Sequence, residues 1–179
     1  MTALRDRLGG AARQRVVITK EPTSKFDLAQ EARLSGAALA AAIAADRALH
    51  VAEVIRPALE AGKMVICDRY ILSSLVFHGM DGVPPEIIWH LNETFPRPDV
   101  HLVLTAPAAV ISSRRDARPA PTRLETASDP AAEQDEYIRF GQAMQQNGSA
   151  LRVLSNETPE QLIQVLEWIM RTIIKVMLS

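Results

Sequence analysis

Short runs of β-branched and other apolar residues alternate with helical patterns along this chain, and this alternation limits its fold more than any other feature. Four runs predict buried strands, at residues 15–19, 64–67, 100–105 and 151–154. Consecutive strands can run parallel only if a crossover, usually a helix, joins them. The sequence therefore predicts an α/β fold in which a parallel sheet is flanked by helices on both faces.

The segments between these runs are predicted to be helical. The longest helix, 37–60, has eight alanines in its first twelve residues and should kink near its end at Pro57. Gly62 should close it. Further helices are expected at the start of the chain and over 27–34, 72–79, 85–95, 107–115, 132–146 and 158 onward.

Size and charge exclude several classes of protein. A chain of 179 residues, with 47% hydrophobic residues, suits a single domain over 1–179. Its net charge of −1 argues against a nucleic-acid partner, and no apolar run is long enough to span a membrane. The single cysteine, Cys67, excludes a disulfide framework and suits a reducing cytoplasm.

Asp68 and Arg69 directly follow the second predicted strand, where α/β proteins bind ligands. A carboxylate there can hold Mg²⁺ directly or through water, and the adjacent guanidinium can bind a phosphate. An ion pair or a helix cap at the end of the strand is the alternative.

Arginines crowd a loop that is rich in Pro, Ser and Thr and extends over about 114–132. Arg114, Arg115, Arg118 and Arg123 could form a lid that stabilises the negative charge of a phosphoryl group in transfer. A solvated loop is the alternative for any one of them.

Several residues on two predicted helices could line a nucleoside pocket. Arg47 could reach from an alanine-rich helix toward a base carbonyl, although a surface charge is the alternative. Ser73, Ser74 and Phe77 share one helical turn after Arg69. No spacing of His and Cys resembles a zinc site. Three histidines are expected to be structural: His50, His90 and His101.

In order along the chain, these residues resemble the thymidylate kinase family of nucleoside monophosphate kinases. Residues 19–23 resemble its TREP segment, and 44–50 resemble its xADRxxH helix. Residues 55–70 are closely similar to its IxPALxxGxxVxxDRY segment. Residues 73–79 and 97–107 fit its SSxxYQG and RPDxxxxLxxxP segments, so the resemblance covers essentially the whole chain.

The resemblance implies a P-loop kinase fold that transfers the γ-phosphoryl group of ATP, with Mg²⁺, to dTMP. Arg69 would hold the acceptor phosphate, Asp68 would help to place Mg²⁺, and a homodimer is expected. The other implied acceptor contacts are Glu21 near the phosphate, Arg47 with a thymine carbonyl, Ser74 at the base edge and Phe77 on the deoxyribose, with Ser73 as a further substrate-binding residue.

Two acceptor-site positions depart from the family pattern. Ile43 stands where the family usually has a Phe that stacks on thymine, and His78 replaces the usual Gln. Losing such a stack weakens recognition by about 1–3 kcal/mol. A kinase for a modified pyrimidine nucleotide is therefore an alternative to a dTMP kinase.

The sequence contains no G-x-x-x-x-G-K-[ST] loop, which in this architecture cradles the phosphates of ATP. We expect that roughly 15–25 residues, carrying that loop and a first strand, are absent. In the family this strand is central, between the strands that end here at Asp68 and Thr105. A truncated kinase is the first expectation, and a non-catalytic pseudokinase that binds nucleotides is the alternative.

Overall fold

The four strands form parallel pairs. The computed structural model describes residues 2–8, 14–118 and 128–178. Strand β1 (Val16–Lys20) pairs in parallel with β2 (Met64–Asp68), and β3 (Val100–Thr105) pairs in parallel with β4 (Ala150–Ser155). The predicted α/β class with parallel strands is confirmed. Within the described ranges, no strand joins the two pairs, which remain separate two-stranded sheets.

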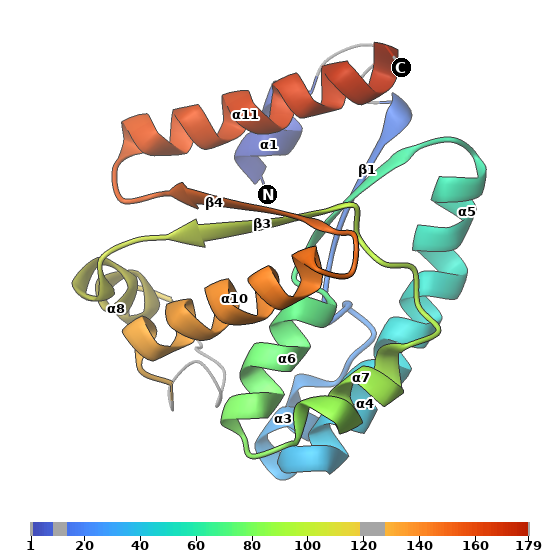
Figure 1. Cartoon of the computed structure of the whole chain (residues 1–179), viewed down its shortest axis with the longest axis vertical. Helices are drawn as coiled ribbons and strands as arrows, with labels where there is room; N and C mark the ends of the chain where they lie inside the picture. Colours follow the sequence, from blue (N-terminus) through green and yellow to red (C-terminus); the bar gives the residue numbers. More distant parts are fainter. Residues whose placement is uncertain (1, 9–13, 119–127, 179) are drawn as a thin grey trace.

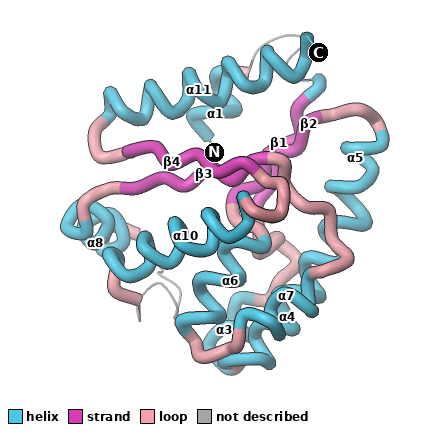
Figure 2. Tube along the Cα trace, viewed as in Figure 1, coloured by secondary structure: helices cyan, strands magenta, loops and turns pink. Residues whose placement is uncertain are grey.

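Helices cover the strands from both sides. In Figures 1 and 2, α11 and α1 lie on one side of β3 and β4, and α10 lies on the other. Helix α6 packs against α10, α7 and α4. The helices are α1 (Thr2–Arg7), α3 (Leu28–Arg33), α4 (Gly36–His50), α5 (Arg56–Glu60), α6 (Ile71–Met80), α7 (Pro85–Asn92), α8 (Ala108–Asp116), α10 (Pro130–Gln145) and α11 (Pro159–Leu178).

The long helix predicted over 37–60 is present, with an irregularity where a kink was expected. A π-helical turn, η1 (Val51–Ile55), connects α4 to α5, and the amide of Arg56 donates to the carbonyl of Val51. Pro57 follows directly. Its ring cannot donate a hydrogen bond and would clash with the carbonyl four residues earlier in a regular helix, so the wider turn accommodates it.

Two helix ends differ from the sequence prediction by more than one residue. Helix α10 begins at Pro130 instead of residue 132, because the side chain of Asp129 caps it by accepting from the amide of Ala132. Helix α7 ends at Asn92, three residues before the predicted end.

Alternate residues of β2 face two different cores. Val65 and Cys67 pack against the main core, which is centred on α6, whereas Met64 and Ile66 pack against a smaller one. That second core contains Leu8, which directly follows α1, Val16 of β1 and Ile173 of α11. β2 is thus covered on both faces, as expected of a parallel strand.

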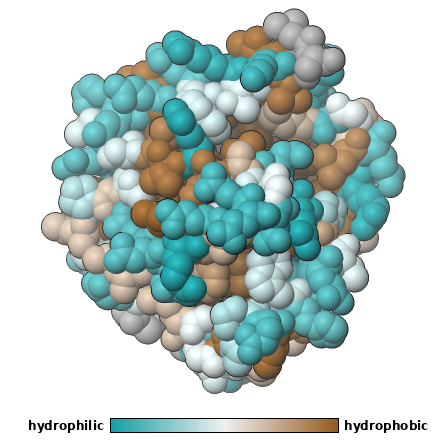
Figure 3. All heavy atoms as spheres, in the orientation of Figure 1, coloured by the Kyte–Doolittle hydropathy of each residue, from teal (hydrophilic) through white to brown (hydrophobic). Residues whose placement is uncertain are grey.

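Hydrophilic side chains cover most of the face seen in Figure 3, and apolar side chains gather between α11 and α10. Strands β3 and β4, which lie between these two helices in Figure 1, have exposed apolar residues that include Leu104 and Val153. Among the described helices, none combines the length and hydropathy that a transmembrane helix requires.

Candidate functional site

The carboxyl ends of β1 and β2 lie side by side and bring the first candidate residues together. Lys20 is in register with Asp68, and the amide of Glu21 donates to the carbonyl of Asp68 over 2.9 Å. The segment after β1 therefore runs beside Asp68 and Arg69, which follow β2. Parallel pairing alone produces this meeting of segments that are far apart in the sequence.

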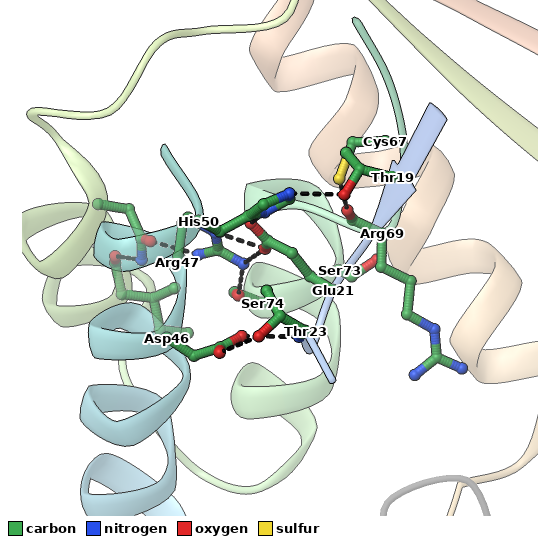
Figure 4. Close-up of polar contacts among 12 residues, drawn as sticks. Thr19, Glu21, Thr23, Asp46, Arg47, His50, Cys67, Arg69, Ser73 and Ser74 are labelled. Atoms are coloured by element: carbon green, nitrogen blue, oxygen red, sulfur yellow. Dashed lines mark hydrogen bonds and ion pairs between the residues drawn. The ribbon is translucent and has the colours of Figure 1, made fainter. Parts of the chain in front are cut away.

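Arg47 lies at the centre of a buried polar network (Figure 4). Its Nε donates to Oε2 of Glu21 over 2.7 Å, its Nη2 donates to Oγ of Ser74 over 3.0 Å, and its Nη1 donates to Oδ1 of Asn92. Arg47 is only 1% exposed, so the alternative that it is a surface charge is wrong. Its guanidinium also stacks 5.0 Å from the ring centre of Tyr70.

His50 is held from both ring nitrogens. Nδ1 lies 2.9 Å from Oε1 of Glu21, and Nε2 lies 2.7 Å from Oγ1 of Thr19. The carboxylate of Glu21 can accept from Nδ1, and in that neutral tautomer Nε2 accepts from the Thr19 hydroxyl. Glu21 thus uses one oxygen for Arg47 and the other for His50.

The loop after β1 is tied to α4 at a second point. The hydroxyl of Thr23 donates to Oδ1 of Asp46 over 2.6 Å, and the Thr23 amide donates to Oδ2 over 2.8 Å. Asp46 and Arg47 are adjacent, so this one turn of α4 fixes both ends of the segment 21–23.

Arg69 turns away from the buried network, as Figure 4 shows. Its backbone is left-handed, with φ of 67°, and its guanidinium lies over the ring of Phe77, 5.2 Å from the centroid. Asp68, its neighbour, is exposed. An exposed carboxylate, a guanidinium and an aromatic ring on adjacent elements suit a ligand that carries both a phosphate and a ring.

Tyr137 on α10 completes the wall beside Arg69. Its hydroxyl donates to Oγ of Ser73 over 2.9 Å, and its ring meets Phe77 edge-on with 6.2 Å between centroids. Burial raises the pKa of Tyr137 to about 12. Sequence reasoning missed Tyr137, because its contacts to α6 arise only when α10 packs there.

The remaining predicted acceptor residues lie on α4 and α6. Ile43 is partly exposed on α4, one turn before Arg47. His78 is buried on α6, as are Ser74 and Phe77. The structure therefore gathers the predicted acceptor residues on two packed helices and the adjoining ends of β1 and β2.

The arginines of the predicted lid have separate environments. Arg114 donates to the carbonyls of Asn156 and Glu157, beyond the end of β4. Arg115 pairs with Glu133 and so joins α8 to α10. Arg118 is exposed after the end of α8. Arg123 lies outside the described residues.

Two different donor sets could hold a metal ion. Asp68 offers one exposed carboxylate, which suits Mg²⁺ because that ion keeps most of its waters and takes few protein ligands. Glu21, His50 and Cys67 offer one ligand atom each, and these atoms lie within 4.8 Å of one another. The Cys67 thiol donates to the carbonyl of Arg69 over 2.9 Å, and its pKa is raised, first by burial and then by Glu21.

Comparisons with known proteins agree on one family. The family model described as thymidylate kinase matches residues 1–165. A probable thymidylate kinase of Pyrococcus abyssi is 41% identical over 115 residues, which cover 58% of this chain and 56% of that protein. The thymidylate kinase of Xanthomonas oryzae pv. oryzae is 42% identical over 123 residues, which cover 65% of this chain and 54% of that protein. The chain thus spans little more than half the length of these relatives.

The fold has a counterpart among solved structures. The crystal structure of thymidylate kinase from Ehrlichia chaffeensis superposes with a TM-score of 0.64 at 19% sequence identity. The match covers 89% of this chain and 81% of the other.

Proposed function

Because this chain belongs to the thymidylate kinase family, we propose that it binds a deoxynucleoside monophosphate, dTMP in the first instance, as the acceptor of a phosphoryl group from ATP. The observation that carries the proposal is the placement of Arg69 over Phe77, beside Asp68 and at the joined ends of β1 and β2. In this arrangement Arg69 binds the acceptor phosphate, and Phe77 packs against the deoxyribose.

The base would meet Arg47, Ser73 and Ser74. Four of the five N–H groups of Arg47 face acceptors in this network. The N–H of Nε and one N–H of Nη2 face Oε2 of Glu21, which lies 2.7 Å from each nitrogen. The other N–H of Nη2 faces Ser74, and one N–H of Nη1 faces Asn92. The fifth, on Nη1, can donate to a thymine carbonyl. Glu21 and Asn92 then act by holding the guanidinium in one orientation.

The proposal includes Mg²⁺ and ATP because membership of the thymidylate kinase family implies them. The exposed carboxylate of Asp68 fits an ion bound through water, which would neutralise charge on the phosphates. Arg114, Arg118 and Arg123 would stabilise the transferred group. The residues that the structure describes hold no glycine-rich loop between a strand and a helix, so we assign them no role in cradling the triphosphate.

Thermal unfolding with added nucleotide tests the acceptor site. Added dTMP should raise the melting temperature of the chain, and Arg69→Ala should remove most of that increase. Arg139→Ala, at an exposed arginine of α10, is the matched control and should leave the increase unchanged. The proposal fails if dTMP does not raise the melting temperature of the wild-type chain. It also fails if dTMP raises the melting temperature of the Arg69→Ala variant by the same amount.

The second candidate function is nucleotide binding without transfer. It requires only the predicted acceptor residues, which lie on α4, α6 and the adjoining ends of β1 and β2. Production of ADP from MgATP that depends on dTMP would support the kinase, and stabilisation by dTMP without such turnover would support the binding protein. Parallel titrations with dUMP and dCMP test whether Ile43 and His78 shift the preference to another pyrimidine nucleotide.

A further inference from the structure

Three side chains with different metal-binding atoms converge behind the acceptor site. Glu21 follows β1, His50 ends α4 and Cys67 lies in β2. One carboxylate oxygen, one imidazole nitrogen and the sulfur all lie within 4.8 Å of one another. These are the three ligand types that zinc takes in proteins, at about 2.0–2.3 Å from the ion. Ligand atoms around such an ion are roughly 3–4 Å apart, so small side-chain rotations close the site.

We propose that Glu21, His50 and Cys67 bind a zinc-like divalent cation, at a site distinct from any magnesium held by Asp68. Sequence spacing could not reveal this site, because its ligands stand 29 and 17 positions apart along the chain. Only the pairing of β1 with β2 and the packing of α4 bring the ligands together.

Strand pairing and hydrogen bonds hold the backbone that carries the ligands. Thr19 and Cys67 are register partners in the parallel pair, so their side chains point to the same face of the sheet. The Thr19 hydroxyl lies 2.7 Å from His50 Nε2, which places the imidazole over that face. Glu21 is anchored to β2 through its amide bond to the Asp68 carbonyl.

The ligands also have the supporting contacts that metal sites use. When a histidine binds an ion through one nitrogen, its other nitrogen usually hydrogen-bonds to a neighbour. Thr19 is placed to accept from Nε2 once Nδ1 carries the ion. Glu21 keeps Arg47 on Oε2 while Oε1, which faces His50, is turned toward the ion.

Two of the three ligands can supply negative charge to a cation. Glu21 contributes one negative charge, and the Cys67 thiol releases its proton to solvent as the sulfur binds, which adds a second. These two negative charges offset the charge of a divalent ion, and Arg47, which stays paired through the other oxygen of Glu21, leaves the buried group with a net charge of +1. Cys67 is partly buried, and Glu21 and His50 are buried.

Cobalt titration gives a direct test, because the chain has a single cysteine. Any thiolate-to-cobalt charge-transfer band must therefore come from Cys67. Co²⁺ added to the folded 179-residue chain should produce that band together with the intense d–d bands of four-coordinate cobalt, and Zn²⁺ should displace both. This readout does not depend on kinase activity, so it separates failure of this site from failure of the proposed function.

Substitutions then assign the ligands. Cys67→Ser should abolish the charge-transfer band, and His50→Gln and Glu21→Gln should each weaken Co²⁺ binding at least tenfold. His90→Gln removes an exposed histidine and should change nothing.

The proposal is overturned if the folded wild type shows no band. It is also overturned if the d–d bands are those of weak six-coordinate cobalt, or if His50→Gln and Glu21→Gln bind with unchanged affinity. The coordination bands of the wild type decide the question even if one of the variants does not fold.

Discussion

Oε2 of Glu21 accepts a 2.7 Å hydrogen bond from Nε of Arg47, and both side chains are almost completely buried. The pair links the segment after β1 to α4. Arg47 also donates to Ser74 on α6 and to Asn92 on α7. A charge buried in this way is tolerable only while its partner is present.

Glu21→Gln should therefore destabilise the chain strongly. Loss of one partner leaves Arg47 charged and unpaired in the interior, which costs about 3–5 kcal/mol in the free energy of unfolding. Glu53→Gln breaks the exposed pair with Lys25 and should cost at most about 1 kcal/mol. Urea unfolding measures both, and a similar small loss in the two variants would contradict the structural role assigned to the buried pair.

Tyr137 should give stability a dependence on alkaline pH. Its pKa is raised to about 12 from a usual value near 10, so the folded chain holds this proton more tightly than the unfolded chain. The stabilisation is complete below pH 10 and is lost as the pH rises from about 10 to 12. Tyr137→Phe cannot ionise and should show a shallower decline of unfolding free energy above pH 10. Tyr70, whose pKa is also raised, contributes equally to both proteins, so an identical slope would refute the assignment.

Gly62→Ala should destabilise the end of α5. Gly62 has φ of 67°, and a residue with a Cβ pays about 1–2 kcal/mol in that left-handed conformation. Gly79 lies in α6, where an added Cβ would meet nothing within 4 Å, so Gly79→Ala should be neutral or stabilising by up to about 1 kcal/mol. In thermal unfolding, Gly62→Ala should lower the melting temperature, whereas Gly79→Ala should leave it unchanged or raise it. Equal effects of the two substitutions would exclude backbone strain at Gly62 as the cause.

Ile43→Phe should strengthen binding of dTMP if the proposed acceptor site is correct. An aromatic ring one turn before Arg47 can stack on the base, which is worth about 1–3 kcal/mol. Calorimetric titration should show an affinity at least about fivefold higher. Leu49→Phe adds a ring at an exposed position of the same helix and should leave the affinity unchanged. Equal affinities of Ile43→Phe and wild type would place the base elsewhere.

The strands and most helices could be predicted from the sequence because their signals are local. The run Val100–Thr105 is mostly apolar and lies between Pro98 and Pro107, and the structure has a strand with those bounds. The start of α10 was predicted two residues late, although Asp129 followed by Pro130 is a recognisable cap and first-turn pair.

The chemistry around Arg47 could not be predicted to the same extent. Its partners come from the end of β1, from α6 and from α7, and their meeting depends on packing. Asn92 carried no signal of its own, since an asparagine near the end of a helix is ordinary. Resemblance to a family pointed to Arg47 and Ser74 but not to the bond between them.

The π-helical turn at Val51–Ile55 affects how this chain should be compared with others. Such a turn places one more residue in the helix than a regular α-helix of the same length would hold. An alignment with a relative whose helix is uninterrupted should therefore open a one-residue gap inside 51–55, instead of in the loops on either side. Without that gap, every position from Arg56 to the end of α5 would be matched to a residue on the wrong side of the helix.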